Sequence, residues 1–193
     1  KHFDSATIFF SDFVGFTGVS EKLSAAELVK EIDTCFKAFD HIVQKYHIEK
    51  IKTIGDAYMA AGGLPKAKTG SAAEVIFAAL EMIEFIEKRK LEKDAKGEPG
   101  FEMRVGIHTG QVVAGIVGVK KFQYDVWGDT VNTASRLESS GEPGKVNISE
   151  ATYGIVKDHP DLVFESRGEI QAKGKGLLKM YFVSRKSTES TPA

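Results

Sequence analysis

The chain has 193 residues, of which 42% are hydrophobic, so it can form one domain with a substantial core. Its 26 lysines and arginines nearly balance its 27 aspartates and glutamates, which gives no electrostatic reason to expect a nucleic acid or an acidic membrane surface as a partner. The single cysteine excludes an internal disulfide framework and a zinc site built from several thiolates, as is usual in a reducing cytosol.

The two ends of the chain predict a domain cut from a longer protein. No apolar run reaches the length of a membrane span, and the first residues lack the pattern of a signal peptide. We therefore expect a soluble, cytoplasmic domain over residues 1–185 that makes no membrane contact, with regulatory domains elsewhere in the full-length protein. Residues 186–193 are polar and small, which predicts a flexible tail.

Apolar periodicity predicts an alternation of strands and helices along the chain. Ser24 is expected to begin the first helix as its N-cap, with Glu27 completing a capping box. Gly55-Asp56 joins two strands, and Thr109-Gly110 is expected to be the turn of a second hairpin. The predicted strands are 6–11, 48–54, 57–61, 101–108, 111–117 and 179–184, and the predicted helices are 24–45, 71–90 and 129–139.

The order of these elements indicates an α+β fold with a split βαβ, ferredoxin-like core (βαββαβ), extended by C-terminal strands and helices. If the first two strands are parallel and the third returns between them, the end of the first strand lies beside the hairpin that begins the third. Asp12 ends the first strand, and Asp56 lies in that hairpin. The two carboxylates are thus expected to be neighbours at one edge of the sheet.

A carboxylate at the end of a buried strand is costly unless it is paired or binds a cation. Two neighbouring carboxylates therefore either share a proton or have a cation between them. Without histidine or thiolate neighbours they suit a hard ion such as Mg²⁺ or Mn²⁺. The turn that follows can direct backbone N–H groups at phosphate oxygens, although an ordinary strand-to-helix loop is the alternative. Its residues are Phe13, Val14, Gly15, Phe16 and Thr17.

Four long segments, in order, are similar to those of a known family: FFSDFVGFT, KIKTIGDAYMAAGGLP, MRVGIHTGQVVAGIVG and QYDVWGDTVNTASRLE. Together they resemble the catalytic domain of the class III nucleotidyl cyclases, the adenylyl and guanylyl cyclases. The resemblance implies the class III cyclase fold and a reaction in which the 3′-hydroxyl of a nucleoside triphosphate attacks its own α-phosphorus and pyrophosphate leaves. It also implies two Mg²⁺ or Mn²⁺ ions per active site, held by Asp12, Asp56 and the backbone carbonyl of Phe13.

The last of these segments places Asn132 and Arg136 four residues apart, on one face of a predicted helix. The resemblance implies that Asn132 orients the ribose and that Arg136 stabilises charge at the α-phosphate, whereas a solvated helix face is the alternative. It further implies that Arg104 and Lys173 contact the triphosphate, although Lys173 also suits a solvated, flexible loop. His108 has no implied role, and we expect it to be a hydrogen-bonded structural residue.

Lys52 and Asp125 match the pair with which adenylyl cyclases recognise adenine. The aspartate accepts from the exocyclic amine, and the lysine donates to a ring nitrogen. Guanylyl cyclases typically have a glutamate and a small residue at these positions, so the pair favours ATP over GTP. Lys50 competes with Lys52 for this role, because regular strand alternation puts both on the same face.

In the family, the metal aspartates and the residues for base, ribose and phosphate come from opposite subunits that meet head to tail. One chain with both sets implies a homodimer with two composite sites, in which residues 118–125 form an arm that reaches across. We therefore expect an adenylyl cyclase homodimer. The alternatives are a guanylyl cyclase, a related palm-like nucleotidyl transferase, and a non-catalytic domain that dimerises or senses nucleotide.

Overall fold

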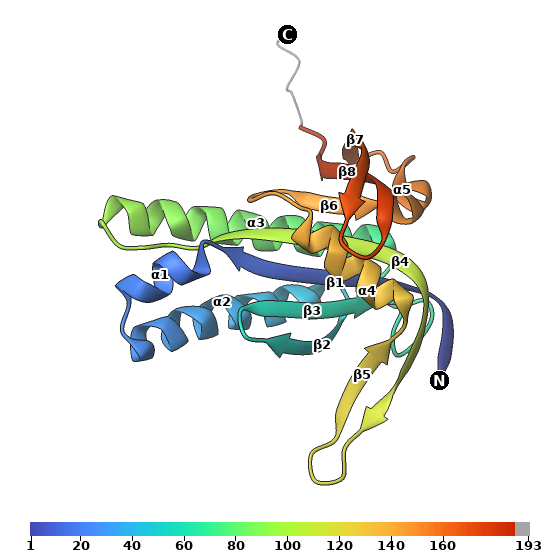
Figure 1. The fold of residues 1–193 in the computed structure, drawn as a ribbon, viewed down its shortest axis with the longest axis horizontal. Coiled ribbons are helices and arrows are strands. Elements are labelled where there is room, and N and C mark those ends of the chain that lie inside the picture. Colours follow the sequence, from blue (N-terminus) through green and yellow to red (C-terminus); the bar gives the residue numbers. More distant parts are fainter. Residues whose placement is uncertain (188–193) are drawn as a thin grey trace.

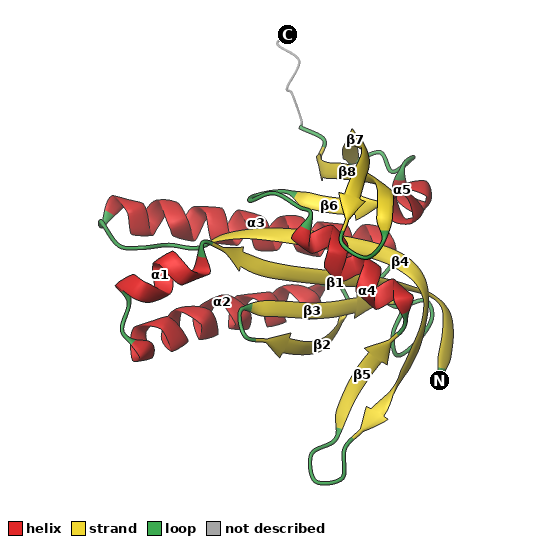
Figure 2. Ribbon diagram, in the orientation of Figure 1, coloured by secondary structure: helices red, strands yellow, loops and turns green. Residues whose placement is uncertain are grey.

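A computed structural model of the chain describes residues 1–187, and the predicted tail at 186–193 lies mostly outside the described residues. Figure 1 and Figure 2 show the elements. The strands are β1 (His2–Val14), β2 (Glu49–Ile54), β3 (Ala57–Gly62), β4 (Glu102–Val117), β5 (Gln123–Trp127), β6 (Val146–Ser149), β7 (Leu162–Ala172) and β8 (Gly176–Arg185). The helices are α1 (Phe16–Lys22), α2 (Ala25–Lys45), α3 (Ala72–Ala95), α4 (Asp129–Ser139) and α5 (Glu150–Val156). Within residues 1–187, no helix has the length and apolar character needed to cross a membrane.

The strands form one sheet in the order β2-β3-β1-β4-β6-β8-β7, and β5 pairs with β4. β3 lies antiparallel between β1 and β2, so β1 and β2 run parallel, as the sequence predicts. β4 lies antiparallel on the other side of β1 and completes the ferredoxin-like core. β6, β8 and β7 then extend the sheet beyond β4. The predicted α+β architecture is confirmed.

The two faces of the sheet carry separate cores. Helices α2 and α3 cover one face, and α4 crosses the other (Figure 1). Adjacent residues of β1 show the division, because Phe9 packs with the α2 and α3 side chains whereas Ile8 packs with Ala134 of α4. Side chains of a strand alternate between faces, so β1 contributes to both cores and its end is held firmly.

The N-termini of the long helices follow from their caps. The side chain of Ser24 accepts a hydrogen bond from the backbone N–H of Glu27 at 3.2 Å and donates to its carboxylate at 2.9 Å. Ser71 does the same with Glu74 at the start of α3. In each case the serine side chain satisfies one backbone N–H that has no acceptor inside the helix. α2 ends where predicted, whereas α3 continues past residue 90 to Ala95.

The predicted hairpin at Thr109-Gly110 is wrong, because β4 runs unbroken from Glu102 to Val117. The Thr109 hydroxyl bonds the Thr7 and Thr152 hydroxyls at 3.0 and 2.9 Å, which holds the strand in the sheet. Gly110 serves close packing instead of a turn: a Cβ there would lie 2.5 Å from the Thr130 hydroxyl oxygen at the start of α4. The chain reverses after Val117, and β5 pairs back along β4.

Candidate active site

The end of β1 and the turn between β2 and β3 meet at one edge of the sheet. The backbone N–H of Phe13 donates to Asp56 Oδ2 at 3.2 Å, so Asp56 lies against the residue that directly follows Asp12. Gly55 forms this turn with a φ of 58°, in the left-handed region that glycine adopts most readily. The topology thus brings the two predicted aspartates to the same place in the fold.

Asp12 is paired with Arg104 across the β1–β4 ladder. Arg104 Nε donates to Asp12 Oδ1 at 2.9 Å and Nη2 donates to Oδ2 at 3.0 Å, a bidentate pair. Burial raises the pKa of Asp12, but hydrogen bonds from Arg104 and Glu138 and the charge of Arg104 outweigh it. The pKa of Asp12 therefore lies below its usual value.

Glu138, which the sequence analysis missed, completes this cluster from the last turn of α4. Arg104 Nε donates to Glu138 Oε1 at 3.1 Å. Burial, a hydrogen bond with Asp12 and the charge of Asp12 raise the pKa of Glu138 to about 8. Glu138 follows the buried Ala134 by four residues, so helical periodicity places a carboxylate on the apolar face of α4. An acidic residue on the apolar face of a helix needs a buried partner, so its position in the sequence could have indicated an ion pair or hydrogen bond at Glu138.

The predicted phosphate turn leads into a short helix. Val14 ends β1, and Gly15 is the N-cap of α1 with a φ of 71°. Phe16 and Thr17 form the first turn of this helix, which the sequence analysis did not predict. The Phe13 ring stacks on Phe101 with centroids 4.4 Å apart, and Phe16 stacks on the same ring at 5.8 Å. The turn therefore rests on an aromatic stack.

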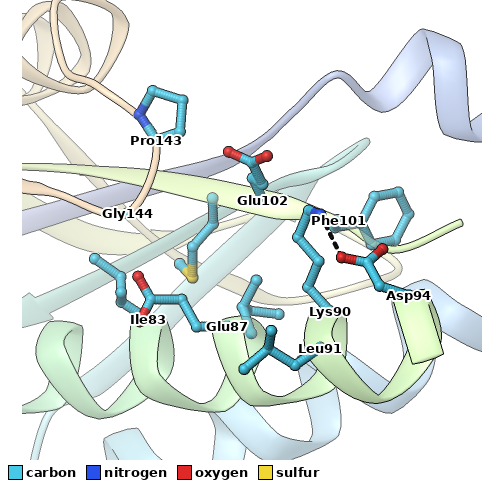
Figure 3. Close-up of a pocket in the computed structure, with 11 residues that line it drawn as sticks. Ile83, Glu87, Lys90, Leu91, Asp94, Phe101, Glu102, Pro143 and Gly144 are labelled. Carbon is cyan, nitrogen blue, oxygen red and sulfur yellow. Dashed lines mark hydrogen bonds and ion pairs between the residues drawn. The ribbon is translucent and has the colours of Figure 1, made fainter.

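Phe101 also lines a cavity of about 410 Å³ between α3 and the start of β4 (Figure 3). Its walls include Ile83, Leu91, Phe101 and Glu102, and its lining contains none of the predicted site residues. Lys90 is also part of the lining and is paired with Asp94 at 2.9 Å. We conclude that this mainly apolar cavity is separate from the candidate site.

The two predicted base-recognition residues form an ion pair. Lys52 Nζ of β2 lies 2.8 Å from Asp125 Oδ2 of β5. The expectation that Lys50 shares this face is wrong: Lys50 Nζ pairs instead with Asp40 of α2, also at 2.8 Å. The β2–β3 register shifts between Lys50 and Lys52, and such an irregularity breaks the regular alternation of faces. The structure thus separates the two lysines that spacing left equivalent.

The remaining predicted residues lie on the outside of the chain. Asn132 is exposed and Arg136 is half-buried on α4, and neither side chain bonds another side chain within residues 1–187. Lys173 is exposed in the turn between β7 and β8, where the next lysine, Lys175, pairs with Asp129 of α4. Within residues 1–187, no side-chain hydrogen bond or ion pair joins the side chains of Asn132, Arg136 or Lys173 to the Asp12 cluster.

His108 is a half-buried residue with a side-chain hydrogen bond, and that hydrogen bond agrees with the prediction. Its Nδ1 lies 2.7 Å from the Ser149 hydroxyl. Burial and the nearby Lys175 charge lower its pKa to about 4, so the ring is neutral at physiological pH. This environment suits a structural role.

Residues 1–185 match the family model of the adenylate and guanylate cyclase catalytic domain. The chain belongs to this cyclase family. The cyclase domain is 38% identical over 190 residues to an adenylate cyclase of Mycobacterium tuberculosis, an alignment that covers 98% of this chain and 42% of that protein. The chain thus spans less than half the length of this relative. Family membership removes the palm-like alternative, and the fold is that of the class III cyclases.

Two solved structures show how closely the cyclase fold is kept. The adenylyl cyclase CyaB from P. aeruginosa is 30% identical with a TM-score of 0.89, covering 97% of each chain. The guanylate cyclase domain of RhGC from Catenaria anguillulae, in complex with GTP, is 34% identical with a TM-score of 0.87, covering 97% of this chain and 100% of that one. Relatives of both nucleotide classes therefore share this fold.

The edge at Asp12 offers a sparse set of hard oxygen donors. Within residues 1–187, no group of three or more histidine, cysteine or acidic side chains is placed to enclose a metal ion. The available donors are the carboxylates of Asp12 and Asp56 and the carbonyl of Phe13. Such a set fits Mg²⁺ or Mn²⁺, which keep several waters and take up substrate phosphates. Cyclases of this family are generally metal-dependent, and these residues fit such ions.

Proposed function

We propose that this domain is an adenylyl cyclase, which converts ATP into 3′,5′-cyclic AMP and pyrophosphate. The observation that carries the choice of ATP is the Lys52–Asp125 ion pair at 2.8 Å. It offers a fixed acceptor for the exocyclic amine of adenine and a fixed donor for a ring nitrogen. Guanine has a carbonyl in place of that amine, so an acceptor would face the Asp125 carboxylate, which is itself an acceptor.

We further propose that the active unit is a head-to-tail homodimer with two composite sites. Exposed apolar side chains gather on the β4–β5 hairpin, which projects from the body of the domain (Figure 1). They are Val113, Ile116, Val117, Val119, Phe122 and Trp127. A projecting apolar surface of this kind favours burial against a partner. Asn132 and Arg136, which lack side-chain partners within residues 1–187, would then face the metal aspartates of the second chain.

In this mechanism the ATP 3′-hydroxyl loses its proton to water and its oxygen bonds to the α-phosphorus, while the bond from that phosphorus to the bridging oxygen of the β-phosphate breaks and pyrophosphate leaves. Asn132 orients the ribose so that the hydroxyl lies in line with the leaving group. Arg136 pairs with the charge that develops on the α-phosphate oxygens. Arg104 and Lys173 hold the triphosphate, and the turn of Val14, Gly15, Phe16 and Thr17 lies against it. Two divalent ions at Asp12, Asp56 and the Phe13 carbonyl would lower the pKa of the hydroxyl and neutralise phosphate charge.

Mixing two inactive variants tests both the activity and the shared site. Asp56→Ala and Arg136→Ala are each expected to be nearly inactive, because each homodimer lacks one half of both sites. Mixed, they should regain cyclic AMP formation, since one of the two composite sites of a heterodimer has both halves intact. A mixture of Asp56→Ala with Asp12→Asn is the matched control and should stay inactive.

Absence of recovery in dimers confirmed by ultracentrifugation would rule out the shared site. GTP is assayed in parallel: preferential cyclic GMP formation would make the domain a guanylyl cyclase. No turnover of either nucleotide by the unmodified domain would favour a non-catalytic role.

A further inference from the structure

Arg104 is shared between two carboxylates of one chain. It donates to both oxygens of Asp12 at 2.9 and 3.0 Å, to Glu138 Oε1 at 3.1 Å and to the Ser139 carbonyl at 3.1 Å. The three side chains are largely shielded, with exposures of 23% for Asp12, 29% for Arg104 and 12% for Glu138. Leaving the shielded guanidinium of Arg104 without an acceptor would cost more free energy than exchanging one acceptor for another.

The bidentate pair occupies the oxygens that a metal ion needs. A divalent cation at Asp12 must take at least one carboxylate oxygen that now accepts from Arg104. It also places a second positive charge beside the guanidinium, and like charges at contact distance repel. Metal binding and the full Asp12–Arg104 pair therefore compete for the same carboxylate.

Acceptors for a displaced Arg104 are already in place at the end of α4. Glu138 Oε1 and the Ser139 carbonyl both accept from its guanidinium. Their position depends on Gly106 of β4, where a Cβ would lie 2.0 Å from the Glu138 backbone nitrogen. Only glycine lets the last turn of α4 lie this close to the strand. The C-terminal end of a helix also favours a cation.

We propose that Arg104 is the resting counter-ion of Asp12, and that Glu138 is a positioning residue that takes over the guanidinium when a divalent ion binds Asp12. The proposal rests on the proposed function, because it concerns how that site takes up its metal. The same α4 carries Asn132 and Arg136, which serve the other composite site of the dimer. The exchange therefore links metal uptake at one site to the helix that acts at the second.

Mn²⁺ binding to the whole chain without nucleotide tests the exchange apart from catalysis. Binding is followed as the rise in melting temperature during a Mn²⁺ titration, which also reports weak affinities. Arg104→Gln removes the competing cation and should tighten Mn²⁺ binding about tenfold, a coupling usual within one ion-pair network. Cyclic AMP formation should fall in the same variant. Unchanged or weaker Mn²⁺ binding by Arg104→Gln would overturn the proposal.

A double-mutant cycle separates positioning by Glu138 from a direct effect on the metal. Glu138→Met removes the second acceptor at similar volume, so Arg104 stays on Asp12 and Mn²⁺ binding should weaken about fivefold. With glutamine at position 104, the same change should have no effect. Equal weakening in both backgrounds would mean that Glu138 acts on the metal directly, and the proposal would fail.

Two controls complete the design. Glu142→Gln alters an exposed carboxylate just beyond α4 and should leave Mn²⁺ binding unchanged. Asp12→Asn should abolish the Mn²⁺-dependent rise, which assigns the signal to this site. The readouts also separate the two proposals. If the Mn²⁺ shifts appear but the mixed variants form no cyclic AMP, the exchange stands and the shared cyclase site fails. If the mixed variants form cyclic AMP but the Mn²⁺ shifts are absent, the cyclase function stands and the exchange fails.

Discussion

The two halves of the proposed site differ in how much of their environment a single chain supplies. In the metal half, Asp12 is paired with Arg104, and Asp56 accepts a backbone hydrogen bond from Phe13. In the other half, Asn132 and Arg136 have no side-chain partner within residues 1–187. The contrast shows that one chain preorganises its acidic groups, whereas the residues proposed to contact the ribose and the α-phosphate have no side-chain partner within residues 1–187.

The largest expected effect is on the packing that supports the metal half. Phe101 is 3% exposed and stacks on both Phe13 and Phe16. Phe101→Ala should reduce the free energy of unfolding by about 3–5 kcal/mol, measured by urea denaturation of the monomer. Phe122→Ala, at a position that is 77% exposed on the β4–β5 hairpin, is the matched control. It should leave monomer stability nearly unchanged and weaken self-association, and equal losses from both variants would contradict the contrast.

Arg136 offers the next test, because its role is expected to be chemical and not structural. Arg136→Ala should lower kcat by about 10²- to 10³-fold, the usual cost of losing a donor to transition-state charge. Its melting temperature should stay the same, since the side chain bonds no other side chain within residues 1–187. Arg104→Ala should lower both quantities, because it leaves Asp12 and Glu138 without their shared partner. A clear fall in the stability of Arg136→Ala would show that the two halves do not differ in this way.

A smaller effect is expected at the base-recognition pair. Lys52→Glu combined with Asp125→Cys should reduce the ratio of kcat/KM for ATP over GTP by about tenfold or more. Lys50→Glu is the control that the structure provides, because Lys50 pairs with Asp40 and lies apart from Asp125. The ratio of the two turnovers in folded protein is the measurement. A constant ratio in the double variant, or a changed one in Lys50→Glu, would show that another residue reads the base.

The smallest effect concerns His108, which the chain holds in place beside Ser149. Its pKa is lowered from 6.5 to about 4 by burial and by Lys175, so between these values the unfolded chain binds more protons than the folded one. The contribution of His108 to stability is therefore complete above pH 6.5 and is lost as the pH falls towards 4. His108→Gln should remove about 1 kcal/mol of the stability difference between pH 7.5 and 5.5. His41→Gln, at an exposed position on α2, should keep the full difference in denaturation experiments, and an unchanged pH dependence in His108→Gln would refute the assignment.

The part of the site that follows from topology was predictable, and the part that follows from local irregularity was not. A strand–helix–hairpin order is enough to bring Asp56 beside the end of β1, whatever the side chains between them. The β2–β3 register shift, by contrast, separates Lys50 from Lys52. β2 contains no glycine or proline that would have indicated this irregularity in the sequence. The Thr109-Gly110 pair is typical of a turn, yet Gly110 lies within β4 and allows Thr130 of α4 to approach the strand.

By itself, the amino-acid sequence indicated the family through four motif segments. Apolar periodicity and chain order then determined the α+β core and placed Asp12 near Asp56. Only the tertiary structure decided which charges meet. Arg104 and Glu138 are 34 residues apart, and their contact depends on the close approach of α4 to β4 at Gly106. Such contacts depend on distances of a few ångströms between elements, which periodicity does not encode.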